Sequence, residues 1–250
     1  MLDALLNIIK NRWHKTRSMP HQEVIANAEI PVQEAFRDIY HNNIWGGTES
    51  VSGPGSSLHK TEIIRRKLPK LFKKIEARSI LDVPCGDFNW MKHVSLDISY
   101  IGADIVPEII LENNNSYLNP NRRFIVLDII KDEIPSADIM LCRDCLVHFS
   151  YNDISYALNN ITKSNIKYLL TTNFPRHKNK NISTGQWRPL NLEADPFNFP
   201  DPILTIKEGR TGRRSEYSDK SLALWRIKDI FSCLAGARPG QESLTRKQYL

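Results

Sequence analysis

Short apolar runs alternate with amphipathic segments through the middle of the chain. The runs are continuous in their apolar character, which is typical of strands that are buried on both faces. The predicted strands are 80–83, 100–103, 124–127, 139–142 and 168–172, and helical spacing appears between several of them, for example at 107–113 and 152–161. Strands that alternate with helices predict an α/β fold, in which a mostly parallel sheet has helices on both faces.

The segments on either side of this core extend the pattern. Residues 58–75 have apolar positions at helical spacing, and Pro69 is expected to kink that helix. Residues 203–208 and 221–227 are apolar runs around a polar turn, and they predict a closing pair of antiparallel strands. The expected division is an N-terminal helical cap and covering loop over 1–57, a core over 58–230 and a tail over 231–250.

The first residues form an amphipathic pattern. Apolar side chains between Leu2 and Trp13 are interleaved with basic residues as far as Arg17. Such a helix lies on a membrane surface or packs on protein, and we favour packing on the domain or on a second subunit. The segment has neither the long apolar stretch nor the small-residue cleavage site of a secretory signal.

Composition narrows the class of protein. At 250 residues, with 41% hydrophobic and 25% charged residues, the chain is long enough for one large globular domain, and it has no apolar run that would span a bilayer. Cys85, Cys142, Cys145 and Cys233 are too few for a disulfide scaffold, which favours a reducing cytoplasm. The formal net charge of +6 indicates an acidic partner without naming it.

Carboxylates end the first three predicted strands. Asp82 ends the first strand, Asp104 the second and Asp128 the third. Ligands of open α/β sheets bind outside the carboxyl ends of the strands, so these side chains should share one crevice. There Asp104 can accept hydrogen bonds from ribose hydroxyls, and Asp128 can face an adenine amino group.

The turn after the first strand discriminates between adenosine-containing cofactors. In "LDVPCGDFNW" (81–90) Gly86 is the single glycine, and Pro84 and Phe88 stand where nucleotide-binding loops usually carry glycines. The pyrophosphate of a dinucleotide needs close approach to bare backbone, whereas S-adenosylmethionine has no phosphate. The missing glycines therefore favour S-adenosylmethionine as the cofactor.

Four stretches together resemble the successive motifs of class I S-adenosylmethionine-dependent methyltransferases: "LDVPCGDFNW", "YIGADIVPEII", "FIVLDII" and "ADIMLCRDCLVHFS". The resemblance covers about residues 58–230, and it implies a Rossmann-like sheet with a terminal antiparallel strand. It also implies cofactor contacts from Asp82, Pro84, Cys85, Gly86, Asp87, Trp90, Asp104, Ile105, Asp128, Ile129 and Arg143. Pro84 and Cys85 are expected to shape the loop and contribute backbone contacts, and the alternative for Trp90 is a place in the core.

A stretch upstream, "IWGGTESVSGPGSS" (44–57), resembles a segment of bacterial methyltransferases encoded with capsule or surface-glycan genes, including those of phosphoramidate capsule decoration. Its glycines and serines are too polar for a core. We expect it to fold over the cofactor, with Trp45, Ser52 or Gly53 in contact, and the alternative is a mobile linker.

Candidate catalytic residues follow the fourth predicted strand. Arg143 and Asp144 come directly after it, where the resemblance places the transferred methyl group, and His148 follows. A neutral His148 could deprotonate a hydroxyl acceptor. The rate should then decrease as the pH drops below the usual histidine pKa, near 6.5. Asp144 either orients the imidazole or binds the acceptor. An acceptor that is already anionic needs no base, and His148 is then a packed histidine.

The same stretch, "CRDC" (142–145) with His148, also raises the question of a metal. A structural zinc site needs a second ligand pair, and the sequence offers none at suitable spacing. We predict no metal.

Basic loops at 175–181 and 209–214 are candidates for acceptor recognition, and the alternative is that they are only solvated. Arginine suits phosphate or carboxylate, and the long stretch 183–202 is expected to wall the acceptor pocket. The predicted acceptor-binding residues are Arg176, Trp187, Arg188, Arg213 and Arg214. We expect O-methylation of a small, phosphorylated or glycan-linked acceptor.

Three other functions remain open. A nucleic-acid methyltransferase fits the positive charge, but the chain has Arg-Asp-Cys-Leu (143–146) where amino-directed enzymes commonly carry Asn/Asp-Pro-Pro-aromatic, and it has no appended RNA-binding module. A nicotinamide-dependent oxidoreductase would need more loop glycines. A non-catalytic cofactor-binding protein would keep Asp104 and dispense with Asp144 and His148.

Overall fold

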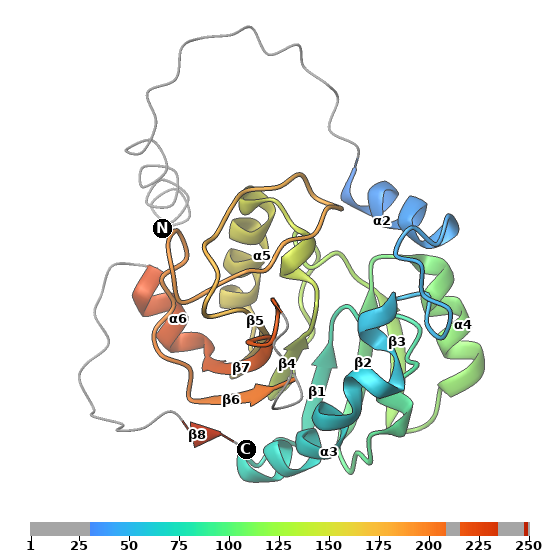
Figure 1. Cartoon of the computed structure of the whole chain (residues 1–250). Helices are drawn as coiled ribbons and strands as arrows, with labels where there is room; N and C mark the ends of the chain where they lie inside the picture. Colours follow the sequence, from blue (N-terminus) through green and yellow to red (C-terminus); the bar gives the residue numbers. More distant parts are fainter. Residues whose placement is uncertain (1–30, 209–215, 235–247, 250) are drawn as a thin grey trace, which may run out of the picture.

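A computed structural model describes residues 31–208, 216–234 and 248–249 of the chain (Figure 1). The predicted N-terminal amphipathic helix and the predicted acceptor residues Arg213 and Arg214 lie outside the described residues.

One mixed sheet organises the described part of the chain. Its strands are β1 (Ser79–Asp82), β2 (Ser99–Asp104), β3 (Arg122–Val126), β4 (Ile139–Cys142), β5 (Tyr168–Asn173), β6 (Leu204–Lys207), β7 (Ser221–Arg226) and β8 (Gln248–Tyr249). They lie in the order β3-β2-β1-β4-β5-β7-β6-β8, and β7 is antiparallel to both of its neighbours while the other pairs are parallel. The predicted fold class is confirmed, including the late antiparallel strand.

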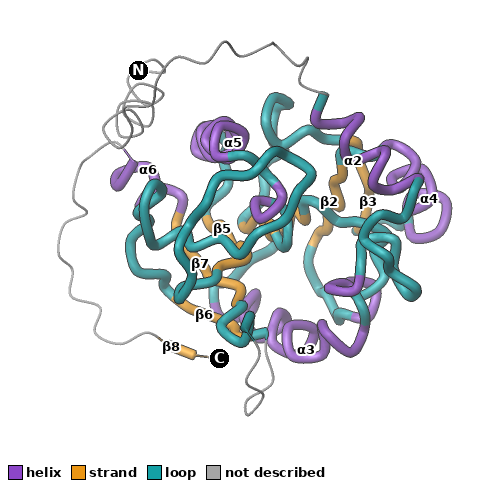
Figure 2. Tube along the Cα trace, turned by 45° about the horizontal axis from the view of Figure 1, so that its top comes forward, coloured by secondary structure: helices purple, strands orange, loops and turns teal. Residues whose placement is uncertain are grey.

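Helices cover both faces of this sheet (Figures 1 and 2). They are α2 (Val32–His41), α3 (Leu58–Lys74), α4 (Pro107–Tyr117), α5 (Tyr151–Lys163) and α6 (Ile227–Leu234), with short 3₁₀ turns η1 (Pro54–Ser56), η2 (Met91–His93) and η3 (Leu146–His148). Successive strand residues point to opposite faces, so that Ile80 packs in the core layer that contains α3 and Leu81 in the layer that contains α5 and α6. The continuous apolar runs of the sequence result from this burial on both faces.

Helix α3 begins at an N-cap residue, Ser57, and continues past Pro69, where the sequence predicts a kink. The Ser57 Oγ accepts a hydrogen bond from the Lys60 amide at 3.4 Å, which satisfies one free N–H of the first turn. Ile64, Leu68, Leu71 and Phe72 form the buried stripe that packs on the sheet. The helix runs unbroken through Pro69 to Lys74.

Helix α2 and the loop that follows it are the described part of residues 1–57, which the sequence predicts to be a cap. Gln33 donates a hydrogen bond to the Ile105 carbonyl, and Arg37 pairs with Glu108 at the start of α4. These contacts place α2 over the carboxyl end of β2. At the other end of the chain, α6 runs past the expected core boundary at residue 230.

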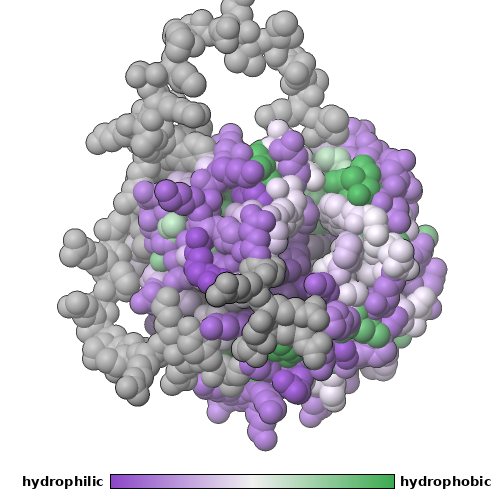
Figure 3. Space-filling model, in the orientation of Figure 1, coloured by the Kyte–Doolittle hydropathy of each residue, from purple (hydrophilic) through white to green (hydrophobic). Residues whose placement is uncertain are grey.

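The surface view shows mostly hydrophilic residues, with hydrophobic side chains in small separate patches (Figure 3). Within the described residues, no helix is both long enough and apolar enough to cross a membrane.

Candidate functional site

A cavity lies at the carboxyl ends of β1, β2 and β4, where the strand order reverses direction. The predicted residues that line it are Trp45, Ser52, Pro84, Cys85, Gly86, Asp87, Trp90, Asp104, Ile105, Asp128, Ile129, Arg143, Asp144 and His148. This position is where open α/β sheets bind ligands. The fold thus brings most of the candidate residues to one place.

The turn after β1 has Phe88 at a position where nucleotide-binding loops usually carry a glycine, and its conformation explains how this is possible. Gly86 has φ +53°, and a Cβ there would lie 2.1 Å from the Ser52 Oγ, so this position needs glycine. Phe88 also has a positive φ, +57°, although it is not glycine. Its buried ring packs edge-on against Phe124 and close to Tyr100 in the core. Phe88 therefore reproduces the backbone conformation of a glycine while its side chain points away from the cavity.

Asp104 is the carboxylate best placed for a ribose. Its Oδ2 accepts from the Gly86 amide at 3.1 Å and its Oδ1 from the Val106 amide at 3.0 Å, which fixes the side chain at the end of β2. Each oxygen keeps a further lone pair for a hydroxyl donor. Burial disfavours the carboxylate and raises the pKa of Asp104 to about 6.

Asp128 and two isoleucines line the cavity together with Asp104. Asp128 accepts from the Ile130 amide at 2.9 Å, and its other oxygen lies 3.3 Å from the exposed Lys131 ammonium. Ile105 and Ile129 line the cavity beside the two carboxylates. Apolar side chains beside carboxylate acceptors suit an adenine ring.

Asp82 does not line the cavity, contrary to the expectation from its position at a strand end. It is 2% exposed and accepts a hydrogen bond from the Tyr100 hydroxyl at 2.6 Å. Burial raises its pKa to about 7, and the hydrogen bond from Tyr100 opposes that rise. Asp82 is therefore part of the polar core beneath the site.

The loop 44–57 covers one side of the cavity. Asp87 holds it there, because its carboxylate accepts from the Ser50 Oγ at 2.9 Å and from the Val51 amide at 3.0 Å. Trp45 and Ser52 line the cavity, whereas Gly53 does not. A Cβ on Gly53 would lie 3.1 Å from the Trp45 Cβ, so Gly53 allows the tryptophan to lie close to the loop.

His148 occupies the end of η3 beneath Trp45, with 4.8 Å between the ring centroids. Its Nδ1 lies 3.0 Å from the Gln186 carbonyl oxygen, which can only accept, so Nδ1 carries the proton and Nε2 keeps its lone pair. Burial lowers the pKa of His148 to about 4, although Asp144 opposes this. The expected change of charge near pH 6.5 is therefore wrong, and the imidazole is neutral at pH 7.

Asp144 binds cations and does not orient the imidazole. Its Oδ2 lies 2.6 Å from the Lys220 ammonium and 3.1 Å from an Arg143 guanidinium nitrogen. Burial alone would raise its pKa, but these cations outweigh burial and lower it, so Asp144 is ionised. Its backbone has φ +53°, unusual for a non-glycine residue and common at functional positions.

Arg143 lines the cavity, but its guanidinium is already engaged. It donates to Glu208 at 2.7 Å and to the Gly55 carbonyl at 2.9 Å, and it also pairs with Asp144. Arg143 thus fastens the covering loop to the ends of β4 and β6. The expected cofactor contact would have to come from the part of its side chain that lines the cavity.

The three predicted acceptor residues that the structure describes, Arg176, Trp187 and Arg188, do not line the cavity. Arg188 is 0% exposed and donates to the Leu146 and Phe149 carbonyls, so it supports the η3 turn that bears His148. Trp187 packs against Phe174 and Tyr217 and is partly exposed, and Arg176 bonds to Ser218 on the same side. The assignment of Arg188 to acceptor binding is therefore wrong, because the side chain is sealed from solvent.

Residues that sequence reasoning missed are mostly apolar. They are Phe36, Tyr40, Val51, Ser56, Val83, Val106, Ile109, Leu127, Cys145 and Phe149. Phe36 and Tyr40 are four apart on α2 and so share a face. That spacing was the only sequence signal for them. In the described residues no group of His, Cys, Asp or Glu side chains could hold a metal ion.

No protein-family model matches this sequence, and no curated protein does. Among solved structures, the magnesium protoporphyrin IX methyltransferase of Synechocystis PCC 6803 with bound SAM has a TM-score of 0.54 and 15% sequence identity, covering 80% of this chain and 99% of its own. Human N-acetylserotonin methyltransferase in complex with SAM has a TM-score of 0.44 and 16% identity, and the match covers 68% of this chain and about half, 49%, of the human enzyme. The first comparison establishes a shared Rossmann-like methyltransferase fold.

Proposed function

We propose that the protein is an S-adenosylmethionine-dependent methyltransferase that methylates an oxygen atom. The observation that carries the proposal is Asp104, a buried carboxylate fixed at the end of β2 beside the Gly86 turn and facing the cavity. Asp104 would hold the ribose hydroxyls, and Asp128 with Ile105 and Ile129 would hold the adenine. The turn 84–87 would lie along the methionine part.

The chain's own residues would contribute alignment and proton removal. The bound cofactor would supply an electrophilic methyl group on a sulfonium, whose carbon–sulfur electron pair stays on sulfur after transfer. Trp45 and the covering loop would exclude water from the cavity. The Nε2 of His148 would accept the proton of an acceptor hydroxyl, and Gln186 would keep the imidazole in the required tautomer.

For the acceptor, we propose only a chemical class. Asp144 and His148 both line the cavity, and Asp144 is paired with Lys220, so this charged pair suits an acceptor with polar groups. A glycan-linked or phosphorylated hydroxyl compound fits that chemistry. The sequence resemblance to surface-glycan enzymes supports the same class of acceptor. The buried free thiols Cys85, Cys142 and Cys145 fit a reducing compartment such as the cytoplasm.

Titration calorimetry tests the cofactor. Wild-type protein should bind S-adenosylmethionine and its demethylated product, and Asp104→Asn should weaken both by about tenfold or more, since hydrogen bonds to a charged group contribute about 1.5–3 kcal/mol. Affinity should also fall as pH drops below about 6, the pKa of Asp104, because protonation removes the carboxylate acceptor.

Asp82→Asn is the matched control, because Asp82 is equally buried at the end of the neighbouring strand but does not line the cavity. It should leave the affinity for S-adenosylmethionine and its pH dependence intact. Binding of a nicotinamide dinucleotide without binding of S-adenosylmethionine would overturn the proposal.

A further inference from the structure

The positive charge of the protein is concentrated on one helix. Of the residues of α3, seven are basic (Lys60, Arg65, Arg66, Lys67, Lys70, Lys73 and Lys74) and one, Glu62, is acidic. Helix α3 therefore carries a net charge of +6, which equals the formal net charge of the whole chain. Charge elsewhere in the chain sums to zero.

Most of these cations face solvent without a counter-charge. The apolar stripe of α3 is buried against the sheet, and Arg66, Lys70 and Lys73 are exposed on the opposite side, while Lys60 is exposed in the first turn of the helix. None of these four forms an ion pair with any residue that the structure describes. Arg65 is different, because it donates to the Leu58 carbonyl of its own helix.

The spacing of the cations is unfavourable for the isolated protein. Arg66 and Lys70 are four residues apart on one helix face, where like charges destabilise a helix. The pKa of Lys67 is lowered by partial burial and then by the neighbouring charges of Arg66 and Lys70. A bound polyanion would relieve this repulsion.

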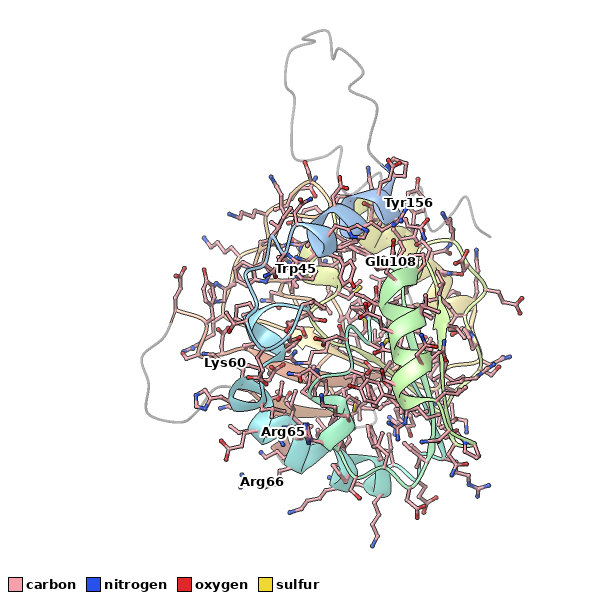
Figure 4. The ribbon with its side chains drawn as sticks, turned by 90° about the vertical axis from the view of Figure 1, so that its right-hand side faces the viewer. Trp45, Lys60, Arg65, Arg66, Glu108 and Tyr156 are labelled. Carbon is pink, nitrogen blue, oxygen red and sulfur yellow. The ribbon has the colours of Figure 1, made fainter. Side chains whose placement is uncertain are left out.

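The basic face leads to the cavity. Helix α3 begins directly after η1, whose Ser56 lines the cavity and whose Gly55 carbonyl binds Arg143. Figure 4 shows Lys60, Arg65 and Arg66 along α3 on the side of the molecule that also carries Trp45. At 1.5 Å per residue, α3 extends about 25 Å from the covering loop.

The aromatic and apolar side chains of α3 indicate which class of polyanion it would bind. Phe72 is 3% exposed, which leaves His59 as the one exposed ring on α3, so the helix offers no row of rings on which successive bases could stack. Its apolar side chains are turned to the sheet, so it has no apolar face to insert into a bilayer. Apart from His59, this face offers charge at intervals along an extended line.

We propose that α3 is a docking surface for an anionic polysaccharide, which lies along Lys60, Arg66, Lys70 and Lys73 and presents its hydroxyl groups to the cavity. The binding surface stands on its own, and the role of the polysaccharide as acceptor rests on the proposed function. A polysaccharide combines the repeated negative charge that α3 requires with the hydroxyl group that His148 would deprotonate.

The test uses heparin, a sulfated polysaccharide, as the probe in fluorescence titrations of the full chain at several salt concentrations. The charge-reversal variant Arg66→Glu, Lys70→Glu and Lys73→Glu should weaken heparin binding at least tenfold, and it should lower the slope of log affinity against log salt by about two. The control variant Arg123→Glu, Lys163→Glu and Lys228→Glu makes the same charge change on other surfaces. It should retain most of the affinity and of the slope.

Calorimetry with S-adenosylmethionine separates this proposal from the proposed function. The α3 variant should bind the cofactor as the wild type does, which also shows that it is folded. An equal loss of heparin affinity in both triple variants would overturn the docking surface. So would tighter, α3-dependent binding of single-stranded RNA or of anionic lipid vesicles than of heparin. Heparin binding without cofactor binding would overturn the proposed function and leave the surface.

Discussion

Burial in the cavity wall disfavours the charged forms of Asp104 and His148, and this moves their pKa values in opposite directions. The pKa of Asp104 rises to about 6 and that of His148 falls to about 4. Above pH 6 the carboxylate accepts hydrogen bonds while the imidazole is neutral. A general base is most effective when its pKa is near the working pH, so the gain expected from His148 is at the lower end of the usual 10²–10⁴ range.

His148→Gln should reduce turnover of a hydroxyl acceptor about 10²-fold and leave cofactor affinity unchanged, because His148 acts only on the acceptor proton. The wild-type rate should show no loss of the base until pH approaches 4. Turnover assays with labelled methyl donor over a pH series measure both. Near-wild-type turnover of the variant would show that the acceptor is already anionic or that alignment suffices.

A second measurement on the same variant needs no acceptor. The unfolded histidine has a pKa near 6.5, above the native value, so the unfolded chain binds the extra proton and the stabilisation from neutral His148 is lost as pH falls from 6.5 to 4. Between pH 7 and pH 5, urea unfolding should show the wild type losing about 2 kcal/mol more than His148→Gln. The raised pKa values of Asp82 and Asp104 make the protein more stable as pH falls. Both residues are present in the wild type and in the variant, so their contributions cancel in the difference between the two proteins.

The strands were predictable because each depends on local pattern. Strands β1, β2, β4 and β5 contain continuous apolar runs, which are typical of strands buried on both faces of a parallel sheet, whereas β3 is an edge strand that begins with two arginines. Carboxylates at strand ends were predictable for the same reason, since topology alone brings Asp104 and Asp128 to one edge. Strand order determines these positions, so no knowledge of side-chain contacts is needed to predict them.

Roles that depend on distant partners were not predictable. Arg188 looked like an acceptor ligand, but it donates to carbonyls about forty residues earlier in the chain and is sealed from solvent. Asp82 looked like a cofactor ligand, but the Tyr100 hydroxyl on the neighbouring strand binds it. A one-dimensional pattern shows that a polar group is buried, not which partner satisfies it.

The covering loop depends on a close approach at Gly86. Gly86→Ala places a Cβ 2.1 Å from the Ser52 Oγ at a φ of +53°, so the Ser52 side chain must move and its hydrogen bonds with Asp87 must loosen. We expect cofactor affinity to fall at least tenfold in calorimetry. Limited proteolysis should cut the stretch 44–57 faster in this variant, because it is no longer held on the turn.

Gly46→Ala is the matched control, because Gly46 lies in the same loop at φ +67° with nothing within 4 Å of its Cβ position. It should cost about 1 kcal/mol of stability from backbone strain and leave cofactor affinity unchanged. Equal loss of affinity in both variants would show that strain, and not contact with Ser52, is responsible.

A cluster of ion pairs joins the ends of β4 and β6, the start of β7 and the covering loop. Arg143 and Asp144 follow β4, Glu208 follows β6 and Lys220 precedes β7, and the Arg143 guanidinium also holds the Gly55 carbonyl of the covering loop. The cluster holds two cations and two carboxylates in a largely buried setting. Breaking a buried pair on one side leaves an uncompensated charge, which costs more than the pair contributes.

Glu208→Gln should therefore destabilise the protein by about 3 kcal/mol in urea unfolding, because Arg143 and Lys220 then share only Asp144. Adding Lys220→Gln restores the balance of charge, so the double variant should lose less than the sum of the single variants, by about 0.5–3 kcal/mol. Lys167→Gln, which breaks an ion pair of Asp138 with a lysine side chain that is 68% exposed, should cost less than about 1 kcal/mol. Additive losses at Glu208 and Lys220 would mean that the two side chains stabilise the sheet independently. The covering loop, the sheet and the site would then not be coupled through this cluster.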